Sequence, residues 1–249
     1  GKLRLKIDIA SKQALQAEEN LEASRLSLVR EIKELYSRLF YYQQAQELLL
    51  RKKEILKNAL KIAEQKYSVG KGIQSDIFKA QVEISGVDEM ILTMEQMAQI
   101  SRANLNSLCD FPPENPLANP EEIPYYELKM SMDELSQTVS EKSPLLKRAE
   151  LMVEESSAEV KMAKKESYPN FMIQAGKDFR GAFKDVYEVM IGVEIPLYHN
   201  KKQANLLQES RSRLGSSRNE YASMKNEIHF MLAENFTMAK TSENLIKLY

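Results

Sequence analysis

Two glycines interrupt a long helix-forming stretch in the sequence Tyr67-Ser68-Val69-Gly70-Lys71-Gly72-Ile73-Gln74-Ser75-Asp76. Glycine readily adopts the positive φ angles that end a helix and turn the chain, so Gly70 and Gly72 predict a helix end and a tight turn. Ser75 is expected to cap the helix that follows. The sequence therefore predicts a helical hairpin with its tip at residues 68–75.

The run before this turn contains no glycine and no proline between Ser11 and Tyr67. Its seam positions recur in alternating steps of four and three, and polar Gln46 and Lys53 interrupt an otherwise apolar series at Leu28, Ile32, Leu35, Leu39, Tyr42, Leu49, Leu56, Leu60, Ala63 and Tyr67. This is the heptad pattern of a coiled coil. A helix of this length would extend about 85 Å, which predicts an elongated bundle. A second apolar stripe predicts neighbours on another side of the helix, through Leu48, Ile55 and Ile62.

The run after the turn carries a second seam in steps of three and four, at Ile77, Ala80, Ile84, Val87, Ile91, Met94, Ala98, Ser101, Leu105 and Leu108. It predicts a helix of about 35 residues that packs antiparallel to the first. Residues 11–110 are thus expected to form one long helical hairpin. Five prolines between Asp110 and Pro124 exclude a regular helix there, so residues 111–143 are expected to be Pro-rich with one short helix.

Ser143 and Pro144 predict the N-cap and first residue of a helix over residues 144–168. The hydrophobic period then changes to two, which predicts a β-hairpin over residues 169–198. One face of this hairpin is expected to carry Phe171, Ile173, Tyr187, Val189, Ile191, Val193, Ile195 and Leu197. Strands of about 9–11 residues with one apolar face are typical of a transmembrane β-barrel, whose outer face contacts lipid. The alternative is a hairpin that covers a soluble core.

A third long helix is predicted over residues 199–249. Its heptad positions are Leu207, Leu214, Tyr221, Ile228 and Asn235, with an adjacent stripe at Met224, Met231, Met238 and Leu245. At the other end of the chain, residues 2–9 alternate like a strand, so residues 1–10 are expected to end a first barrel strand pair. Since a strand followed by a long helix then occurs twice, we interpret the chain as a truncated piece of an internally repeated protein.

The charge balance excludes several function classes. Lys and Arg number 35 and Asp and Glu 36, so the net charge of −1 gives no support to nucleic-acid binding. Catalysis requires titratable groups that converge on a rigid concave site, whereas the carboxylates here lie on long helix faces beside Lys and Arg. We therefore predict no enzymatic activity, no catalytic residues and no cofactor.

Metal binding is also not predicted. The chain has one cysteine and two histidines, His199 and His229, which are too few for a Cys/His zinc site. Thioethers favour soft metals, but the spacing of the twelve methionines favours packing within the bundle. Cys109 is expected to be a buried free thiol at a helix end.

Three segments resemble the TolC-like outer-membrane efflux protein family. Residues 67–81 resemble the helix-tip pattern of that family, Tyr-x-x-Gly followed by Ser-x-Asp-hydrophobic-x-x-Ala-Gln. Residues 168–198, which end in Glu194-Ile195-Pro196-Leu197-Tyr198, resemble its second barrel hairpin. Residues 31–36 resemble the helix that follows its first hairpin. The resemblance implies a mainly α fold of long antiparallel coiled-coil hairpins with one β-hairpin from a transmembrane barrel.

The resemblance also implies a function. The full-length protein would be a homotrimer that forms an outer-membrane barrel and a periplasmic helical tunnel. It would passively export small molecules, metal ions or proteins, together with an inner-membrane transporter and a periplasmic adaptor protein. The adaptor would contact the helix tip at Val69, Gly70, Lys71, Gly72, Ile73, Ser75 and Asp76.

Two further expectations accompany this interpretation. One hairpin cannot close a barrel, so the fragment itself is expected to be soluble and at most weakly associated. The alternative function is that of a soluble coiled-coil scaffold protein, or of the helical hairpin of an adaptor.

Overall fold

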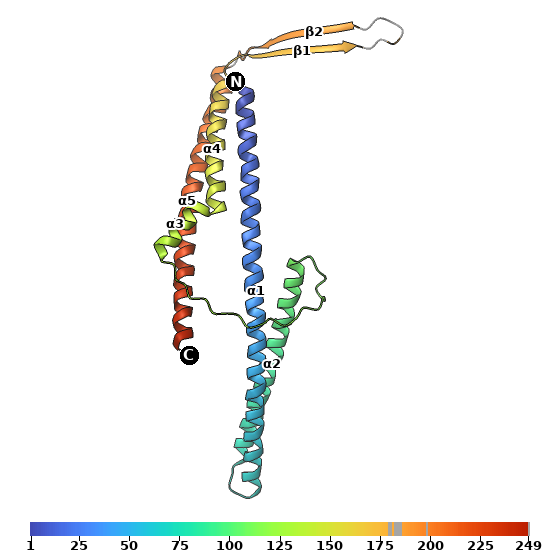
Figure 1. Cartoon of the computed structure of the whole chain (residues 1–249), viewed down its shortest axis with the longest axis vertical. Helices are drawn as coiled ribbons and strands as arrows, with labels where there is room; N and C mark the ends of the chain where they lie inside the picture. Colours follow the sequence, from blue (N-terminus) through green and yellow to red (C-terminus); the bar gives the residue numbers. More distant parts are fainter. Residues whose placement is uncertain (179–180, 182–185, 198, 249) are drawn as a thin grey trace. The chain divides into compact units, whose positions relative to one another are not determined.

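The structure, a computed structural model of the chain, describes residues 1–178, 181, 186–197 and 199–248. Along these residues the elements are α1 (Lys2–Ser68), α2 (Gln74–Leu108), α3 (Met132–Lys142), α4 (Pro144–Lys165), β1 (Asn170–Asp178), β2 (Val186–Glu194), the π-helix η1 (His199–Gln203) and α5 (Ala204–Leu248) (Figure 1). The predicted fold class, long helical hairpins with one β-hairpin, is confirmed. The chain divides into two units, one of residues 25–126 and one of residues 1–24 with 127–249.

In the unit of residues 25–126, α2 runs back along α1 (Figure 1). Every predicted seam position of α2, from 77 to 108, is buried or half-buried. Leu39 of α1 packs there against Ala98 and Leu105 of α2, and all three side chains are at least nine-tenths buried. Heptad spacing therefore predicted these seam positions of α2 correctly.

The seam of α1 is shorter than its heptad pattern. The half-buried or buried positions run in steps of three and four from 32 to 63, whereas Leu28 and Tyr67 are exposed. Lys53 occupies a seam position, and its Nζ lies 2.5 Å from a carboxylate oxygen of Asp88 on α2. The pairing of this charge inside the seam explains why the helix tolerates a lysine there.

Residue Asn106 organises the loop after α2. It is 1% exposed, and its side-chain amide donates to the carbonyl oxygens of Pro113 and Asn115, at 3.0 and 2.8 Å. Asp110 turns the chain with a φ of 60°. Cys109 is exposed, so the prediction of a buried thiol is wrong, because Cys109 follows the last seam position of α2 and no longer faces α1.

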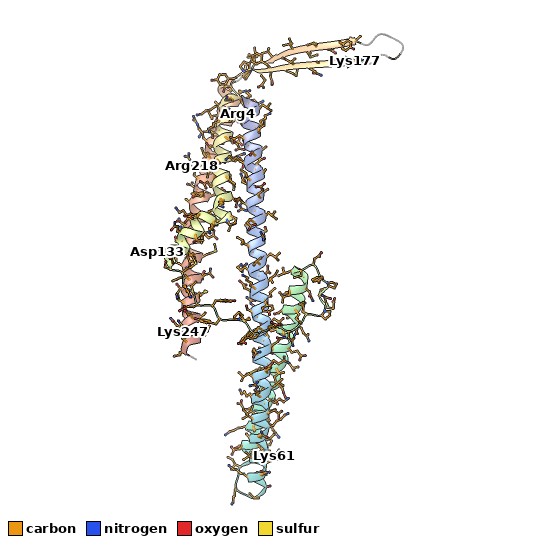
Figure 2. The ribbon with its side chains drawn as sticks, viewed as in Figure 1. Arg4, Lys61, Asp133, Lys177, Arg218 and Lys247 are labelled. Carbon is orange, nitrogen blue, oxygen red and sulfur yellow. The ribbon has the colours of Figure 1, made fainter. Side chains whose placement is uncertain are left out.

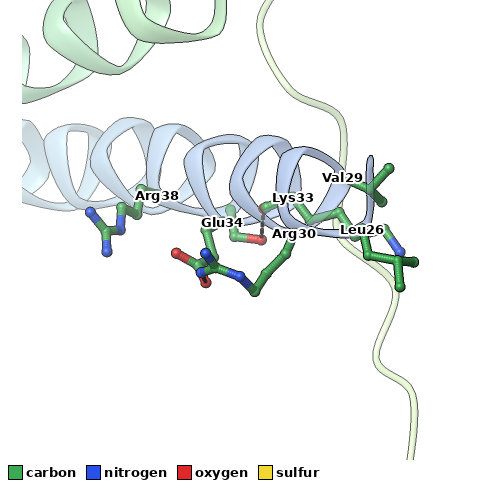
Figure 3. Close-up of a pocket in the computed structure, with 7 residues that line it drawn as sticks. Leu26, Val29, Arg30, Lys33, Glu34 and Arg38 are labelled. Carbon is green, nitrogen blue, oxygen red and sulfur yellow. Dashed lines mark hydrogen bonds and ion pairs between the residues drawn. The ribbon is translucent and has the colours of Figure 1, made fainter. Parts of the chain in front are cut away.

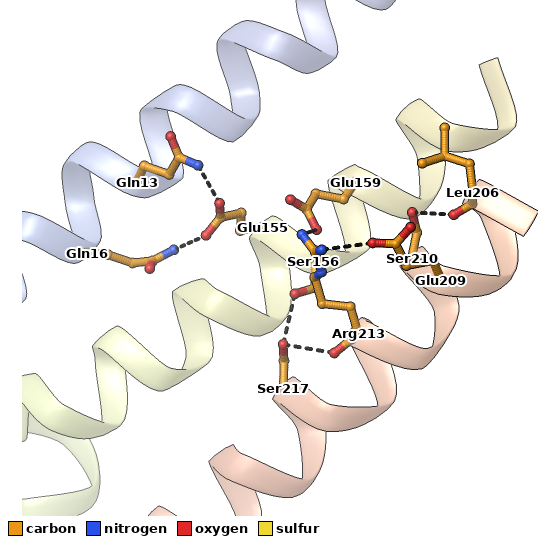
Figure 4. Close-up of polar contacts among 10 residues, drawn as sticks. All are labelled: Gln13, Gln16, Glu155, Ser156, Glu159, Leu206, Glu209, Ser210, Arg213 and Ser217. Carbon is orange, nitrogen blue, oxygen red and sulfur yellow. Dashed lines mark hydrogen bonds and ion pairs between the residues drawn. The ribbon is translucent and has the colours of Figure 1, made fainter. Parts of the chain in front are cut away.

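In the other unit, α4 packs closely against α5 through small side chains. Four residues of α4 and two of α5 are buried along this contact or beside it, Ala149, Ser156, Ala158, Ala163, Ser210 and Ser217. The hydroxyl groups of Ser156 and Ser217 lie 2.8 Å apart and share a hydrogen bond (Figure 4). Small residues allow the two helix backbones to approach each other closely.

The contact between α4 and the first part of α1 is polar. Gln13 and Gln16 of α1 each donate a 2.6 Å hydrogen bond to the carboxylate of Glu155 (Figure 4). Lys12 pairs with Glu154, and the side chain of Asn20 accepts a hydrogen bond from Arg148 of α4 at 2.8 Å. Long side chains therefore connect these two helices.

Residues 2–10 are helical, so the strand predicted there is wrong. Leu5 and Ile9 are half-buried, whereas Leu3 and Ile7 are 71% and 62% exposed. The half-buried positions continue in helical steps to Lys12. The apparent alternation arose because leucine, lysine and arginine, which are good helix formers, happened to alternate over eight residues.

The apolar stripe predicted for α5 is wrong in the second half of the helix. The buried face follows the heptad as far as Ile228, but Met231, Met238 and Leu245 are exposed. Beyond Ile228 the protected positions advance mostly in steps of four, at Leu232, Phe236, Lys240 and Glu243. A straight helix repeats every 3.6 residues and therefore drifts away from a strict repeat of seven.

The two strands form an antiparallel pair in which Phe171, Ile173 and Ala175 lie opposite Val193, Ile191 and Val189. The apolar face predicted from period two is thus a single continuous face of the hairpin. Ile195 lies outside β2, which ends at Glu194. Pro196 has no backbone N–H to donate and restricts the residue before it, so the ladder ends there.

Candidate functional site

The hairpin tip is a glycine-dependent helix end. Gly70 has a φ of 72°, its N–H donates to the carbonyl oxygen of Tyr67 at 3.0 Å, and the N–H of Lys71 donates to that of Lys66 at 2.8 Å. These two bonds form a Schellman motif, which satisfies carbonyl groups at the end of α1. The structure therefore supports the predicted positive φ at Gly70.

Gly72 is required for a different reason. Its φ is not positive, but a Cβ atom there would lie 2.9 Å from the backbone nitrogen of Tyr67 and 3.1 Å from the carbonyl carbon of Lys66. The prediction of a positive φ at Gly72 is wrong, and close approach to the end of α1 explains the glycine instead.

The start of α2 also differs from the prediction. Ile73, with an extended backbone, is the N-cap residue, and it makes no side-chain capping bond. Ser75 lies inside the first turn, so the prediction that it caps the helix is wrong. Asp76 is in that first turn, where a carboxylate interacts favourably with the positive end of the helix dipole.

The side chains left exposed at the tip are apolar or basic. Val69 and Ile73 are 67% and 61% exposed, and Lys71 is also exposed. Tyr67 and Phe78 flank them and are about half exposed. Since the two glycines are explained by the turn itself, these exposed side chains are the part of the tip that packing within the chain does not explain.

An exposed stripe of α1 points away from α2. It repeats every seven residues and comprises Tyr41, Leu48, Ile55 and Ile62. Each of these side chains is more than half exposed. The sequence indicated three of its members, Leu48, Ile55 and Ile62, and the same step of seven extends the stripe to Tyr41.

The apolar face of the β-hairpin is exposed along its whole length. Its members between Phe171 and Val193 are 53% to 78% exposed, namely Phe171, Ile173, Tyr187, Val189, Ile191 and Val193. Within the described part of the chain, no helix packs on this face. Exposed contiguous apolar surface of this kind is typical of a contact with another molecule or with lipid.

Polar groups surround the base of the hairpin. The Nζ of Lys2 lies 2.6 Å from the side-chain oxygen of Asn170 and 3.4 Å from the carboxylate of Glu166. It also donates to the carbonyl oxygen of Tyr168, and Asn170 donates to Glu194 at 3.1 Å. The apolar face therefore begins directly beyond a hydrogen-bonded polar cluster.

A surface hollow on α1 does not form a binding site. It is lined by Leu26, Val29, Arg30, Lys33, Glu34, Ser37 and Arg38, all from one helix (Figure 3). Its polar contacts are internal to that helix, such as the 2.7 Å ion pair of Arg30 with Glu34. A single helix does not enclose a ligand, so the hollow does not supply a concave site.

Among the described residues, no group of three or more His, Cys, Asp or Glu side chains is placed to hold a metal ion. Over the same residues, no helix combines the length and the apolar composition needed to cross a bilayer. Tyr198, at the end of the predicted hairpin, and Phe179 and Phe183, which lie between the two strands in the sequence, are outside the described residues. His229 approaches Ser136 of α3, with its Nδ1 3.4 Å from the hydroxyl oxygen.

Comparison with known proteins gives a family match over part of the chain and a fold over nearly all of it. Residues 1–109 match the family of outer membrane efflux proteins. No curated protein matches the chain in sequence.

Solved membrane proteins match the chain over nearly its whole length. The outer membrane protein VceC of Vibrio cholerae is 16% identical over 99% of the chain, with a TM-score of 0.86. A membrane protein of Pseudomonas aeruginosa is 17% identical over 100% (TM-score 0.84), and the MtrE outer membrane channel of Neisseria gonorrhoeae 17% over 99% (TM-score 0.77). The chain covers 61%, 60% and 58% of these three proteins.

The fold is therefore that of the TolC-like outer-membrane channels. The resemblance to outer-membrane efflux proteins that the sequence predicted is confirmed, in the sequence of residues 1–109 and in the fold of the whole chain.

Proposed function

We propose that this chain forms part of a subunit of an outer-membrane efflux channel. Its helices would contribute to the wall of a periplasmic tunnel and its β-hairpin to a membrane barrel. The channel would be a passive conduit for small molecules, metal ions or proteins, supplied by an inner-membrane transporter through a periplasmic adaptor.

The observation that carries this proposal is the exposed apolar face of the hairpin. Phe171, Ile173 and Ile191 are each more than 70% exposed, and they are adjacent in the strand register. Burial of such side chains stabilises by about 1.5–3 kcal/mol each relative to exposure, so a lipid environment gives this face a large favourable contribution. A face of alternating apolar residues toward lipid is typical of membrane barrel strands.

Self-association is supported by the second stripe of α1. Its four members, Tyr41 to Ile62, repeat with the heptad spacing that places one helix seam against another. We infer that this stripe packs against neighbouring helices of the assembled trimer.

The adaptor would bind at the hairpin tip. Val69 and Ile73 supply exposed apolar area and Lys71 supplies a positive charge, which suits an acidic group on the partner. Four other predicted residues would affect adaptor binding only indirectly, because they set the shape of the turn that presents these side chains. They are Gly70, Gly72, Ser75 and Asp76.

The proposal is tested by export in cells that produce the full-length protein with single substitutions. Val69→Asp, Ile73→Asp and Lys71→Glu are expected to abolish export of a toxic compound, while the trimer and its melting temperature remain unchanged. Ile191→Asp is expected to remove the protein from the outer-membrane fraction, because a carboxylate on the lipid face is unfavourable.

Gly70→Asn is the matched control for the tip. Asparagine tolerates the positive φ of this position, so the turn and export should both be retained. If the three tip variants export normally, the tip is only a turn and adaptor binding there is excluded. If Ile191→Asp stays in the outer membrane, the hairpin face does not contact lipid, and a soluble scaffold becomes the better interpretation.

A further inference from the structure

A hollow between the first turns of α1 and the last turns of α4 carries an excess of positive charge. It has a volume of about 610 Å³, and its charged side chains are Arg4 and Asp8 of α1 and Lys161 and Lys165 of α4. Figure 2 places Arg4 at the end of α1 that lies beside the hairpin. Three cationic groups therefore line this hollow together with one carboxylate, in a space large enough for a small polar group.

The charges of these three cations are not compensated by pairing. Across the residues that the structure describes, the side chains of Arg4, Lys161 and Lys165 form no ion pair and no hydrogen bond. Farther from the hairpin, the same two helices do pair their charges, as in the contact of Lys12 with Glu154. The unpaired positive charge is thus confined to the end of the α1–α4 contact that adjoins the hairpin.

Packing and helix electrostatics explain only one of the two lysines of α4. The negative end of a helix dipole favours a cation in the last turn, where Lys165 lies. Lys161 is four residues earlier, so the two ammonium groups share one face of the helix and repel each other. An anionic ligand in the hollow would replace this repulsion with attraction.

Lys165 also adjoins the apolar face of the hairpin. It lines a second hollow, of about 530 Å³, together with Tyr168 and Phe171. Phe171 begins the apolar face and is 78% exposed. Lys2 lines the same hollow, but its charge is compensated by Glu166. Positive charge and exposed apolar surface therefore meet at this point, as a phospholipid requires, because its phosphate group is attached next to its acyl chains.

We propose that Arg4, Lys161 and Lys165 bind the phosphate group of an anionic membrane lipid whose acyl chains lie against the hairpin face at Phe171. The inference rests on the proposed function, because it requires this face to lie in lipid. Lysine stems lie along apolar surface while their ammonium groups extend to the headgroups, and a guanidinium group can donate two parallel hydrogen bonds to one phosphate. Each cation near an anionic membrane surface strengthens binding about fivefold.

The test measures flotation of the chain with vesicles of phosphatidylcholine, alone or mixed with phosphatidylglycerol. The triple variant Arg4→Gln, Lys161→Gln and Lys165→Gln is expected to lower the preference for the anionic vesicles about a hundredfold, at about fivefold for each charge. Its binding to neutral vesicles should stay unchanged. Its melting temperature should not fall, because the three side chains make no contact that the substitutions remove.

A second triple variant makes the same charge change elsewhere in this unit. It combines Lys147→Gln, Arg218→Gln and Lys225→Gln, three exposed positions of α4 and α5. Lys147 precedes Lys161 by 14 residues, which is about 21 Å along the helix. Interactions over such a distance are largely screened at physiological salt, so this control should retain the preference for anionic vesicles.

Three outcomes overturn the proposal. If the two triple variants lower the preference equally, only the overall charge of the chain matters. If inorganic phosphate abolishes the preference of the wild type at constant ionic strength, the hollow takes free phosphate rather than lipid. If the triple variant of Arg4, Lys161 and Lys165 binds both kinds of vesicle more weakly to the same extent, these residues support the fold instead.

A further variant separates this inference from the function on which it rests. Ile173→Asp should abolish binding to neutral vesicles. If it does not, the hairpin face does not contact lipid, and the proposed function fails together with the inference. If it does, while the triple variant of Arg4, Lys161 and Lys165 behaves as the wild type, only the phosphate contact is wrong.

Discussion

Ser156 of α4 and Ser217 of α5 share a buried hydrogen bond of 2.8 Å between their hydroxyl oxygens (Figure 4). The hydroxyl of Ser217 also donates to the backbone carbonyl oxygen of Arg213 at 3.1 Å. Both serines are at positions where a larger side chain would separate the two helices. This pair therefore lies where α4 and α5 are in direct contact.

The size of residue 156 should therefore matter more than its hydroxyl. Ser156→Ala is expected to cost about 1 kcal/mol, because Ser217 keeps its bond to Arg213. Ser156→Leu should cost about 1–3 kcal/mol, since the added volume forces the helices apart. Urea unfolding followed by circular dichroism measures both. Ser212→Leu on the exposed face of α5 is the control, and an equal effect there would refute close packing at Ser156.

The two glycines of the tip should respond differently to alanine. Gly70→Ala places a Cβ at a positive φ, which costs about 1–2 kcal/mol, although the space around it is open. Gly72→Ala places a Cβ against the backbone of Tyr67 and should cost more, because the turn must open. Thermal melting of the two variants gives the comparison. A Gly72→Ala protein as stable as Gly70→Ala would show that the turn is not closely packed.

Replacement of Asn106 should loosen the Pro-rich loop. Asn106→Ala leaves the carbonyl groups of Pro113 and Asn115 without their donor, at a cost of about 1–3 kcal/mol. We expect a lower melting temperature and faster proteolysis between residues 109 and 126. Asn104→Ala, at an exposed position one residue before Leu105, is the control and should change neither. Unchanged proteolysis of the Asn106 variant would exclude its role in holding the loop.

The stability of the chain should depend on acid through Glu243. Hydrogen bonds from Lys240 and then Lys247 lower the pKa of this carboxyl from 4.5 to about 2. Because the folded state has the lower pKa, the stabilising contribution is present above pH 4.5 and is lost as the pH falls through about 2. Lys240 also donates to the carbonyl oxygen of Leu128, so this cluster fastens the segment before α3 to α5.

Glu243→Gln should remove that contribution at neutral pH and flatten the acid dependence of the unfolding free energy between pH 4.5 and about 2. Chemical unfolding at a series of pH values measures the slope. Glu234→Gln, at an exposed position of the same helix, should leave the slope as it is in the wild type. A wild-type slope in the Glu243 variant would show that the carboxylate is not held by the two lysines.

The helical hairpins were predictable because packing against one neighbour imposes a strict repeat. The buried face of α2 followed from heptad spacing alone, and the strand register agreed with period two. The predictions were wrong where that repeat is interrupted or covers only a few residues. Residues 2–10 are too few for period two to outweigh helix propensity. In α5 the buried positions no longer follow the heptad after Ile228, because the neighbour of the helix there is no longer α4 but α3 and the segment of Leu128.

The position of the turn in the candidate site was predictable from the sequence, but the contacts that shape this turn were less so. The turn at Gly70 followed from the known conformational freedom of glycine. The close approach of Gly72 to Tyr67 and the N-cap at Ile73 depend on three-dimensional contacts that no spacing encodes.

Because the contact of α1 with α4 is polar, we expect α1 to separate from α4 before α4 separates from α5. Lys12, Gln13 and Gln16 hold α4 through groups that water and salt ions replace at little cost, whereas the serines and alanines toward α5 lose van der Waals contact when they separate. Rising ionic strength should therefore detach the first turns of α1 while α4 and α5 stay joined. Helix α4 is therefore expected to keep its contact with α5 and to lose its contact with α1 as the salt concentration rises, which would leave the end of this unit beside the hairpin free to separate.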